Sequence, residues 1–173
     1  MAHFSELDRL VLEHLPAALR FAVRMTDDRD AAEELVQEAL VRVAQRWGAF
    51  RGEATFRTWL IRILINVFRD QLRRRSLAIV SLDEEEHVAS DPKAREPVEI
   101  AATGELCERV AVAVSRLPPR QREVLVLIVY EELSVAETAV LVGITEQNVY
   151  ATLSAARGQL KRRLAHDLGF AEK

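Results

Sequence analysis

The chain has 173 residues, 49% of them hydrophobic, which suits one medium domain or two small ones. No apolar run approaches the roughly 18 residues of a membrane span and no signal peptide opens the chain, so we expect a soluble cytoplasmic protein. Cys107 is the only cysteine, which excludes an intramolecular disulfide and a thiolate metal cluster. We expect its side chain to be a small buried hydrophobic group.

Charge is unevenly distributed along the chain, whose formal net charge is −3. Residues 1–80 hold 13 basic and 11 acidic side chains (net +2), residues 81–104 hold 2 and 7 (net −5), and residues 105–173 hold 9 of each. Basic clusters at 73–75 and 161–163 lie near the ends of predicted helices. They suit phosphate contacts, but Lys and Arg also favour helix C-termini because of the macrodipole, so charge alone leaves both interpretations open.

The first predicted elements are helices. Apolar residues repeat at helical spacing from Leu7 to Val23, and Pro16 predicts that a second helix starts there. After a turn at 27–30, Asp30 is the predicted cap of the next helix, with Glu33 as its capping-box partner. That helix buries a stripe containing Leu35, and its other face carries Glu34, Gln37, Glu38, Val41 and Arg42.

A loop at residues 50–54 leads into a long helix predicted from about Phe56 to Arg75. Its buried stripe includes Trp59, and its opposite face carries Arg62, Asn66, Arg69, Asp70 and Arg73. Ile61 and Ile65 interrupt that polar face. The pair indicates either a partner surface or a second buried contact within the chain.

Periodicity is lost over residues 81–104, which are acidic and lack aromatic residues, as expected of a linker. Four further helices are predicted: 105–116, one opened by Pro118-Pro119, one capped by Ser134 with Glu137, and one capped by Thr145 and ending near residue 165. We therefore predict an all-α fold of two small helical domains, 1–80 and 105–173, joined by the acidic linker 81–104.

The last two predicted helices have the spacing of a helix-turn-helix. Ala139 provides the small residue where the helices cross, Gly143 the turn residue that can take positive φ, and Ile144 and Val149 the apolar anchors after the turn.

Three segments together resemble the extracytoplasmic-function (ECF) sigma factors, two-domain transcription initiation subunits of bacterial RNA polymerase. These are DRDAAEELVQEAL (28–40), FRGEATFRTWLIRILINVFRDQLRRR (50–75) and LPPRQREVLVLIVYEELSVAETAVLVGI (117–144). The resemblance implies that the partners are core RNA polymerase, promoter DNA and an anti-sigma factor. It also implies that residues 1–80 are sigma region 2, that 105–173 are region 4, and that the two domains pack together when free, which would hide both DNA faces.

No enzyme activity, cofactor or metal is expected. The four histidines lie in separate segments without metal-ligand spacing, and no Gly-rich phosphate loop or nucleophile motif is present.

The resemblance also assigns residues of the N-terminal domain. Those expected to bind core polymerase are Glu34, Leu35, Gln37, Glu38 and Val41, although the stripe position of Leu35 favours burial. Those expected to bind unpaired bases and phosphates of the −10 element are Arg51, Gly52, Glu53, Ala54, Arg62, Asn66, Arg69, Asp70 and Arg73. Trp59 suits base stacking, but its place in the buried stripe favours a core role.

The helix after the turn departs from the family. Where ECF sigma factors usually carry basic residues that project into the −35 groove, this chain has QNVYATLSAAR, in which only Arg157 matches. The residues expected at the −35 element are Arg120, Thr145, Gln147, Asn148, Tyr150, Ala151, Thr152, Ala155, Arg157 and Lys161, with Arg122 also available for phosphate.

Three interpretations of this helix remain open. It binds a −35 element, with Gln and Asn suiting adenine and the Thr and Ala methyls suiting thymine. It binds protein instead, as in a sigma-like decoy that sequesters an anti-sigma factor. Or its face is only solvated.

Overall fold

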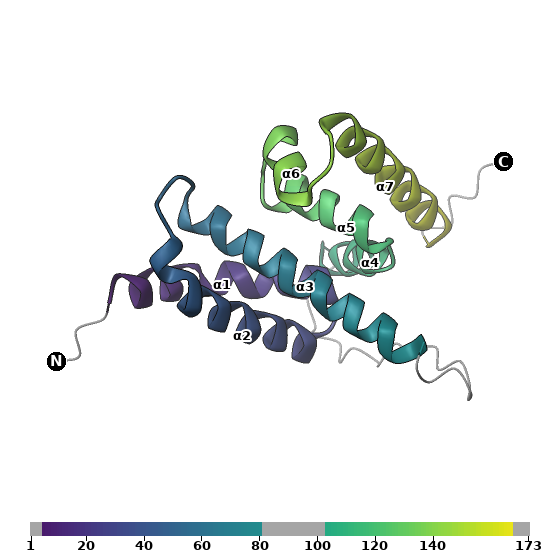
Figure 1. The fold of residues 1–173 in the computed structure, drawn as a ribbon. Helices are drawn as coiled ribbons and strands as arrows, with labels where there is room; N and C mark the ends of the chain where they lie inside the picture. Colours follow the sequence, from purple (N-terminus) through teal and green to yellow (C-terminus); the bar gives the residue numbers. More distant parts are fainter. Residues whose placement is uncertain (1–4, 81–102, 168–173) are drawn as a thin grey trace.

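The computed structural model describes residues 5–80 and 103–167, and every regular element within them is a helix (Figure 1). The predicted all-α class is confirmed for this part of the chain. The predicted linker lies almost wholly outside the described residues. The elements are α1 (Glu6–Thr26), α2 (Arg29–Arg46), the 3₁₀ turn η1 (Trp47–Ala49), α3 (Phe56–Val80), α4 (Thr103–Ser115), α5 (Pro119–Leu125), the π-helical turn η2 (Val126–Tyr130), α6 (Val135–Val142) and α7 (Glu146–Asp167).

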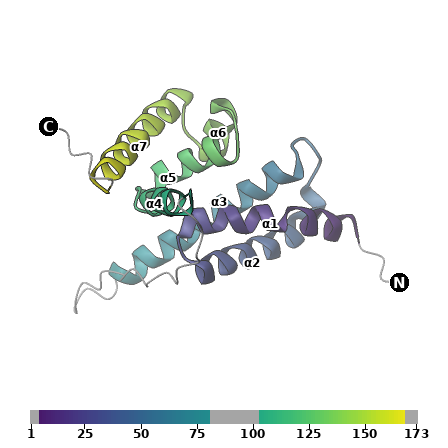
Figure 2. The ribbon, with the colours of Figure 1, turned by 180° about the vertical axis from the view of Figure 1, so that it is seen from behind.

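The N-terminal half is a bundle of α1, α2 and α3, which pack lengthwise against one another (Figures 1 and 2). Its centre is apolar because each helix places one stripe inward: Phe21 and Met25 from α1, Leu35 from α2, and Leu64 and Val67 from α3 are all at most 1% exposed.

Helix α1 is continuous, so the prediction of a new helix at Pro16 was wrong. Proline removes one backbone donor and usually ends or kinks a helix. Here Pro16 lies on the solvent side, as does Leu12 one turn earlier, so water can reach the carbonyl that proline leaves without its helical donor. The apolar stripe passes unbroken on the other side, and its burial keeps the helix in one piece.

The cap of α2 also differs from the prediction. The cap is Asp28, whose side chain accepts a hydrogen bond of 2.7 Å from the backbone N–H of Ala31, while Asp30 lies inside the first turn. Asp27 takes the left-handed conformation (φ 59°) that ends α1, so the chain reverses two residues earlier than expected.

The C-terminal half contains the predicted helix-turn-helix. Ser134 and Glu137 form the expected capping box of α6, and Gly143 ends that helix with φ 71°. Thr145 accepts a hydrogen bond from the backbone N–H of Asn148 in the first turn of α7. Val149 is fully buried, so α7 is anchored after the turn as predicted.

The two halves pack together into one hydrophobic cluster. Helix α1 contacts α4, α5 and η2, and the views from front and back both show α4 lying beside α1 (Figures 1 and 2). Ile61 and Ile65 are 4% and 1% exposed, so the apolar pair on the polar face of α3 makes a buried contact within the chain. Cys107, expected to be buried, is exposed on α4.

Candidate nucleic-acid interface

The loop before α3 stands on a cluster of aromatic rings. Trp47 and Phe50 stack with centroids 5.5 Å apart, and Phe50 and Phe56, one at each end of the loop, meet at 6.0 Å. Trp59 packs on Phe50 at 5.0 Å and is part of this cluster, as the buried-stripe position favoured. The rings hold both ends of the loop, which therefore presents its predicted −10 residues to solvent: Arg51, Gly52, Glu53 and Ala54 are all exposed.

Helix α3 continues from this loop and separates the predicted −10 residues into two groups. Arg62, Asn66 and Arg73 are exposed on one face. Arg69 and Asp70 are half-buried and paired: Asp70 accepts a hydrogen bond of 2.9 Å from Arg42. The first group is accessible to a ligand in this conformation, although Arg73 also lies 3.8 Å from the Asp70 carboxylate, whereas the second group is held in closer pairs.

Arg69 is held by the C-terminal half. Its Nε and Nη2 donate to the two carboxylate oxygens of Glu123 at 3.0 and 2.8 Å, and Nη2 also donates to the carbonyl of Val142 at 3.2 Å. The Glu123 side chain is only 3% exposed, and Arg120 is its second partner at 3.3 Å. A carboxylate this deeply buried is stable only with such charged donors.

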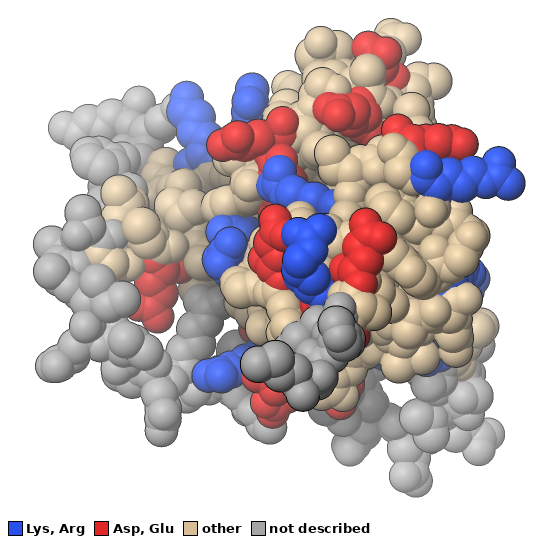
Figure 3. All heavy atoms as spheres, turned by 90° about the vertical axis from the view of Figure 1, so that its left-hand side faces the viewer, with Lys and Arg blue, Asp and Glu red and all other residues tan. Residues whose placement is uncertain are grey.

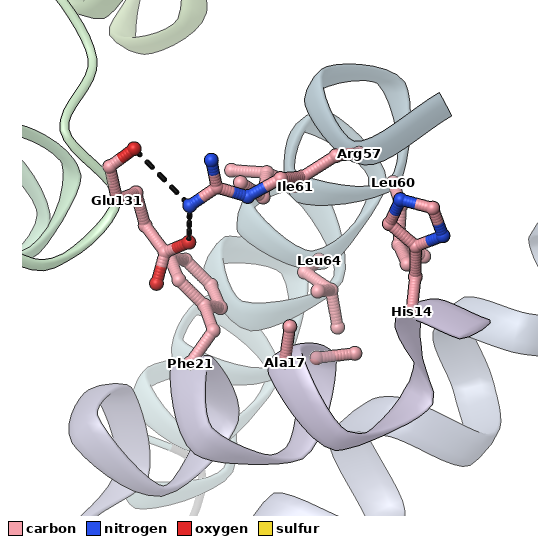
Figure 4. Close-up of a pocket in the computed structure, with 9 residues that line it drawn as sticks. His14, Ala17, Phe21, Arg57, Leu60, Ile61, Leu64 and Glu131 are labelled. Carbon is pink, nitrogen blue, oxygen red and sulfur yellow. Dashed lines mark hydrogen bonds and ion pairs between the residues drawn. The ribbon is translucent and has the colours of Figure 1, made fainter. Parts of the chain in front are cut away.

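A second arginine of α3 is paired in the same way. Arg57 Nη2 donates to the Glu131 carboxylate at 2.8 Å and to the Glu131 carbonyl at 3.2 Å (Figure 4). The Glu131 side chain is 6% exposed, and Arg24 of α1 lies 4.0 Å from it. Arg57, Glu123 and Glu131 were not among the predicted site residues. The spacing of 57, 61, 65 and 69 in steps of four is the one sequence signal for this arrangement.

The predicted polymerase face of α2 is mostly accessible. Glu34, Gln37 and Val41 are exposed, Val41 by 56%. Leu35 is fully buried, so its side chain belongs to the helical bundle.

Glu38, also predicted to bind polymerase, is half-buried in an ion-pair network. It accepts hydrogen bonds from Arg42 and Arg74, both at 2.7 Å, and from Gln71 at 3.3 Å. Burial by itself raises the pKa of Glu38, but the hydrogen bonds from Arg74, Arg42 and Gln71 together lower it below its ordinary value. Glu38 is therefore charged at neutral pH and joined through Arg42 to Asp70 on α3.

The predicted −35 face of α7 is open to solvent. Its accessible members are Thr145, Gln147, Asn148, Tyr150, Ala151, Ala155, Arg157 and Lys161, with Tyr150 61% exposed, while Thr152 is half-buried. Arg120 is exposed as well as paired with Glu123. Because α7 lies on the side of the C-terminal half away from α1–α3, packing of the halves leaves this face uncovered (Figure 1). The expectation that both DNA faces would be hidden was wrong.

Arg122, which was expected to be available for phosphate, is half-buried between the two halves of the chain instead. Its guanidinium donates to the carbonyl of Met25 at the end of α1 and to those of Ser115 and Leu117 at the end of α4. Burial lowers the pKa of Arg122, and the nearby Asp27 carboxylate opposes that shift. Arg122 therefore caps two helix ends and is unavailable to DNA here.

Positive charge is not concentrated on the side that holds the 50–55 loop. Among the described residues seen in Figure 3, Lys and Arg side chains lie singly beside Asp and Glu, without a continuous basic surface. In this conformation this side of the molecule therefore attracts DNA only weakly.

Comparisons with known proteins agree with this arrangement. The family model "Sigma-70 region 2" matches residues 10–77, and "Sigma-70, region 4" matches residues 107–160. The chain is 32% identical to the ECF RNA polymerase sigma factor SigE of Mycolicibacterium smegmatis, covering 91% of this chain but 61% of that protein. It is 30% identical to SigM of Mycobacterium tuberculosis (94% and 78%) and to the RNA polymerase sigma-E factor of Streptomyces avermitilis (95% and 89%).

Two solved structures are similar over 93% of this chain. One is the sigma factor RpoE in complex with the anti-sigma factor NepR from Bartonella quintana, with a TM-score of 0.75, 24% identity and 98% of that chain covered; it shows that the fold is shared. The other is CnrH in complex with the cytosolic domain of CnrY, with a TM-score of 0.65, 26% identity and 88% of that chain covered. The curated relatives are described as sigma factors, which favours that interpretation over the decoy. The chain belongs to the ECF sigma factors of RNA polymerase.

Proposed function

We propose that the chain directs core RNA polymerase to promoters and stabilises the opened −10 strand, using binding energy without covalent chemistry. The observation that carries this proposal is the exposed 51–54 loop on its aromatic base, directly before a helix that presents Arg62 and Asn66. A base that leaves the stack needs a rigid pocket edge and nearby donors, and this loop and helix supply both. This activity belongs in the cytoplasm, where polymerase and DNA are found.

Residues 1–80 serve as region 2 in this proposal. Asn66 makes paired hydrogen bonds to a base edge, and Arg62 and Arg73 bind phosphates or stack on bases. Core polymerase docks on the exposed residues Glu34, Gln37 and Val41 of α2. Because Glu38 and Asp70 are both bonded to Arg42, the polymerase face and the DNA face are mechanically connected.

Residues 105–173 serve as region 4 and bind the −35 duplex through α7. Gln147 and Asn148 are exposed in the first turn, where they suit adenine, and Ala151 suits the thymine methyl. Few phosphates are contacted, since the exposed cations here are Arg157, Lys161 and Arg162 of α7, with Arg120 of α5. Affinity for the −35 element is therefore modest and depends weakly on salt.

An anti-sigma factor is the proposed regulatory partner. One structural relative, the sigma factor RpoE, was solved in complex with the anti-sigma factor NepR. A partner that favours the closed packing of the two halves would keep Arg69 on Glu123 and away from the −10 strand.

The proposal is tested by run-off transcription from a library of random promoters, with the full chain and bacterial core polymerase. Enrichment of both a −10 and a −35 motif is expected. Asn66→Ala should relax one −10 position, and the Gln147→Ala, Asn148→Ala double variant should relax the −35 motif alone. Absence of transcripts, in a preparation that binds core polymerase, would refute promoter recognition.

A further inference from the structure

Four residues of α3 form one continuous ridge, Arg57–Ile61–Ile65–Arg69. They are spaced by four residues, which aligns them along the helix surface. The two isoleucines are buried and the two arginines flank them. The exposed DNA-facing residues Arg62 and Asn66 lie immediately beside the ridge, one position further along the chain than Ile61 and Ile65. The ridge therefore borders the proposed −10 face along its whole length.

The ridge meets the segment from Glu123 to Glu131 at both of its ends. Arg57, near the start of α3, meets Glu131, and Arg69, three turns later, meets Glu123, so the two helices run antiparallel. Each arginine thus has a carboxylate from the other half of the chain as its partner. Leu127, midway between the two glutamates, is fully buried.

The π-helical turn sets the register of the two glutamates. In a regular α-helix, eight residues turn through roughly 800°, about 80° beyond two full turns, so Glu131 would point away from the face of Glu123. In η2 the N–H of Glu131 instead bonds the carbonyl of Val126, five residues back, at 3.1 Å. The wider turn rotates each residue through a smaller angle and returns Glu131 to the ridge.

Both contacts have the chemistry of an arginine bound to an anion. A phosphate of the unpaired strand offers the same oxygen acceptors as these carboxylates, and arginine is suited to either. Arg69 is already assigned to the −10 strand. Arg57 occupies the equivalent position at the other end of the ridge, in the first turn after the 51–54 loop, and its side chain is 44% exposed even when paired.

We propose that Arg57 is a further strand-binding residue of region 2, and that Glu131 occupies its phosphate site while the two halves are packed together. The proposal rests on the proposed function, since it extends the −10 face by one residue. When the halves separate, Arg57 and Arg69 lose their carboxylate partners together. Both then become available to successive parts of the strand.

The test separates a DNA contact from a purely structural pair. Glu131→Gln removes the competing carboxylate and leaves only the backbone carbonyl of residue 131 as an internal partner, so Arg57→Gln in that background reports mainly on DNA. The full chain is titrated into a fluorescent 20-nucleotide single strand of mixed sequence at several salt concentrations. Glu131→Gln should bind more tightly than the wild type. The double variant should bind about tenfold more weakly than Glu131→Gln, the size of one charge-assisted hydrogen bond, and its salt slope should fall by about 0.7, the value for one phosphate on a single strand.

Controls in the same background make each outcome decisive. Arg57→Lys should keep the salt slope of Glu131→Gln, because the charge remains. Arg73→Gln tests the proposed −10 face of α3. If Arg73→Gln weakens binding while Arg57→Gln does not, Arg57 is only a partner of Glu131. That result would overturn the inference about Arg57 and leave the proposed function intact. If neither variant changes binding, or no protein binds the strand, the proposed −10 face itself is wrong.

Discussion

Replacing Arg69 should separate the two halves of the chain. We call the packed arrangement seen in the structure the closed form, and the arrangement with separated halves the open form. Arg69→Met keeps most of the side-chain volume but deletes both donors to Glu123, whose side chain is 3% exposed. Breaking a buried ion pair by removing one partner costs about 3–5 kcal/mol, because the remaining charge is left in a poor solvent. The chain can avoid that cost by separating its halves so that water reaches Glu123. We therefore expect the variant to populate the open form.

The expected change in the ratio of closed to open chains follows from the same free energies. Arg120 remains as a second partner of Glu123 at 3.3 Å, so we take the lower end, about 3 kcal/mol. That corresponds to a change of more than about a hundredfold in the ratio of closed to open chains, since about 1.4 kcal/mol is a factor of ten. Even a wild type that is 99% closed would become about half open.

Single-molecule energy transfer can measure this ratio. Cys107 is exposed on α4 and is the only native cysteine, so it takes one dye directly. Gln45→Cys on the exposed side of α2 takes the other. Arg73→Met is the matched control, because it removes the same charge from the same helix at a side chain 72% exposed and outside the interface. An unchanged distribution in Arg69→Met would show that the other contacts between the halves hold them together without the Arg69–Glu123 pair, which would refute the reasoning.

Three further predictions concern stability and pH. Leu35→Ala should lower the free energy of unfolding by about 2–5 kcal/mol in urea titrations, because Leu35 is fully buried. Val41→Ala should leave the free energy of unfolding unchanged and weaken core polymerase binding in pull-down assays. Equal effects of the two variants on stability would contradict the burial of Leu35. Hydrogen bonds from the Ser134 side chain and backbone lower the pKa of Glu137 below 4.5. This capping box therefore contributes stability above pH 4.5 and loses it as the pH falls through the lowered pKa. Ser134→Ala should return the NMR titration midpoint of Glu137 toward 4.5. Arg122→Met leaves three helix-end carbonyls without their donor and should destabilise the chain by about 1–3 kcal/mol, with Arg122→Lys intermediate; unchanged thermal unfolding would show that water replaces the guanidinium.

Local chemistry was the predictable part of this fold. The capping box of Ser134 with Glu137, the left-handed Gly143 and the cap at Thr145 each depend on residues within three or four positions of one another, so their signals lie in the sequence. The helix start at Pro16 failed for a related reason. Proline usually interrupts a helix because it removes one backbone hydrogen bond. In α1, burial of the continuous apolar stripe stabilises the unbroken helix by more than the loss of that hydrogen bond destabilises it.

The contacts between the halves could not be predicted in the same way. Arg57 and Glu131 are separated by 74 positions, and nothing local marks them as partners. The π turn that aligns Glu131 with Glu123 depends on a five-residue hydrogen bond with no sequence signal. Arg122 looked like a surface cation beside the helix-turn-helix, and only the packing of α1 against α4 shows that it caps both helix ends.

Packing of the two halves affects the proposed phosphate contacts and the proposed base contacts unequally. It pairs Arg57 and Arg69 with carboxylates beside the proposed −10 face, but it leaves Asn66, the 51–54 loop and most of the predicted −35 face of α7 exposed. The proposed base-reading groups therefore stay accessible while two of the proposed phosphate-binding groups, Arg57 and Arg69, are neutralised. Because phosphate contacts provide most of the affinity for nucleic acid and base contacts most of the specificity, closure lowers affinity without altering which sequence is preferred. Release of the two arginines would then raise binding to every strand, and the exposed face would select among them.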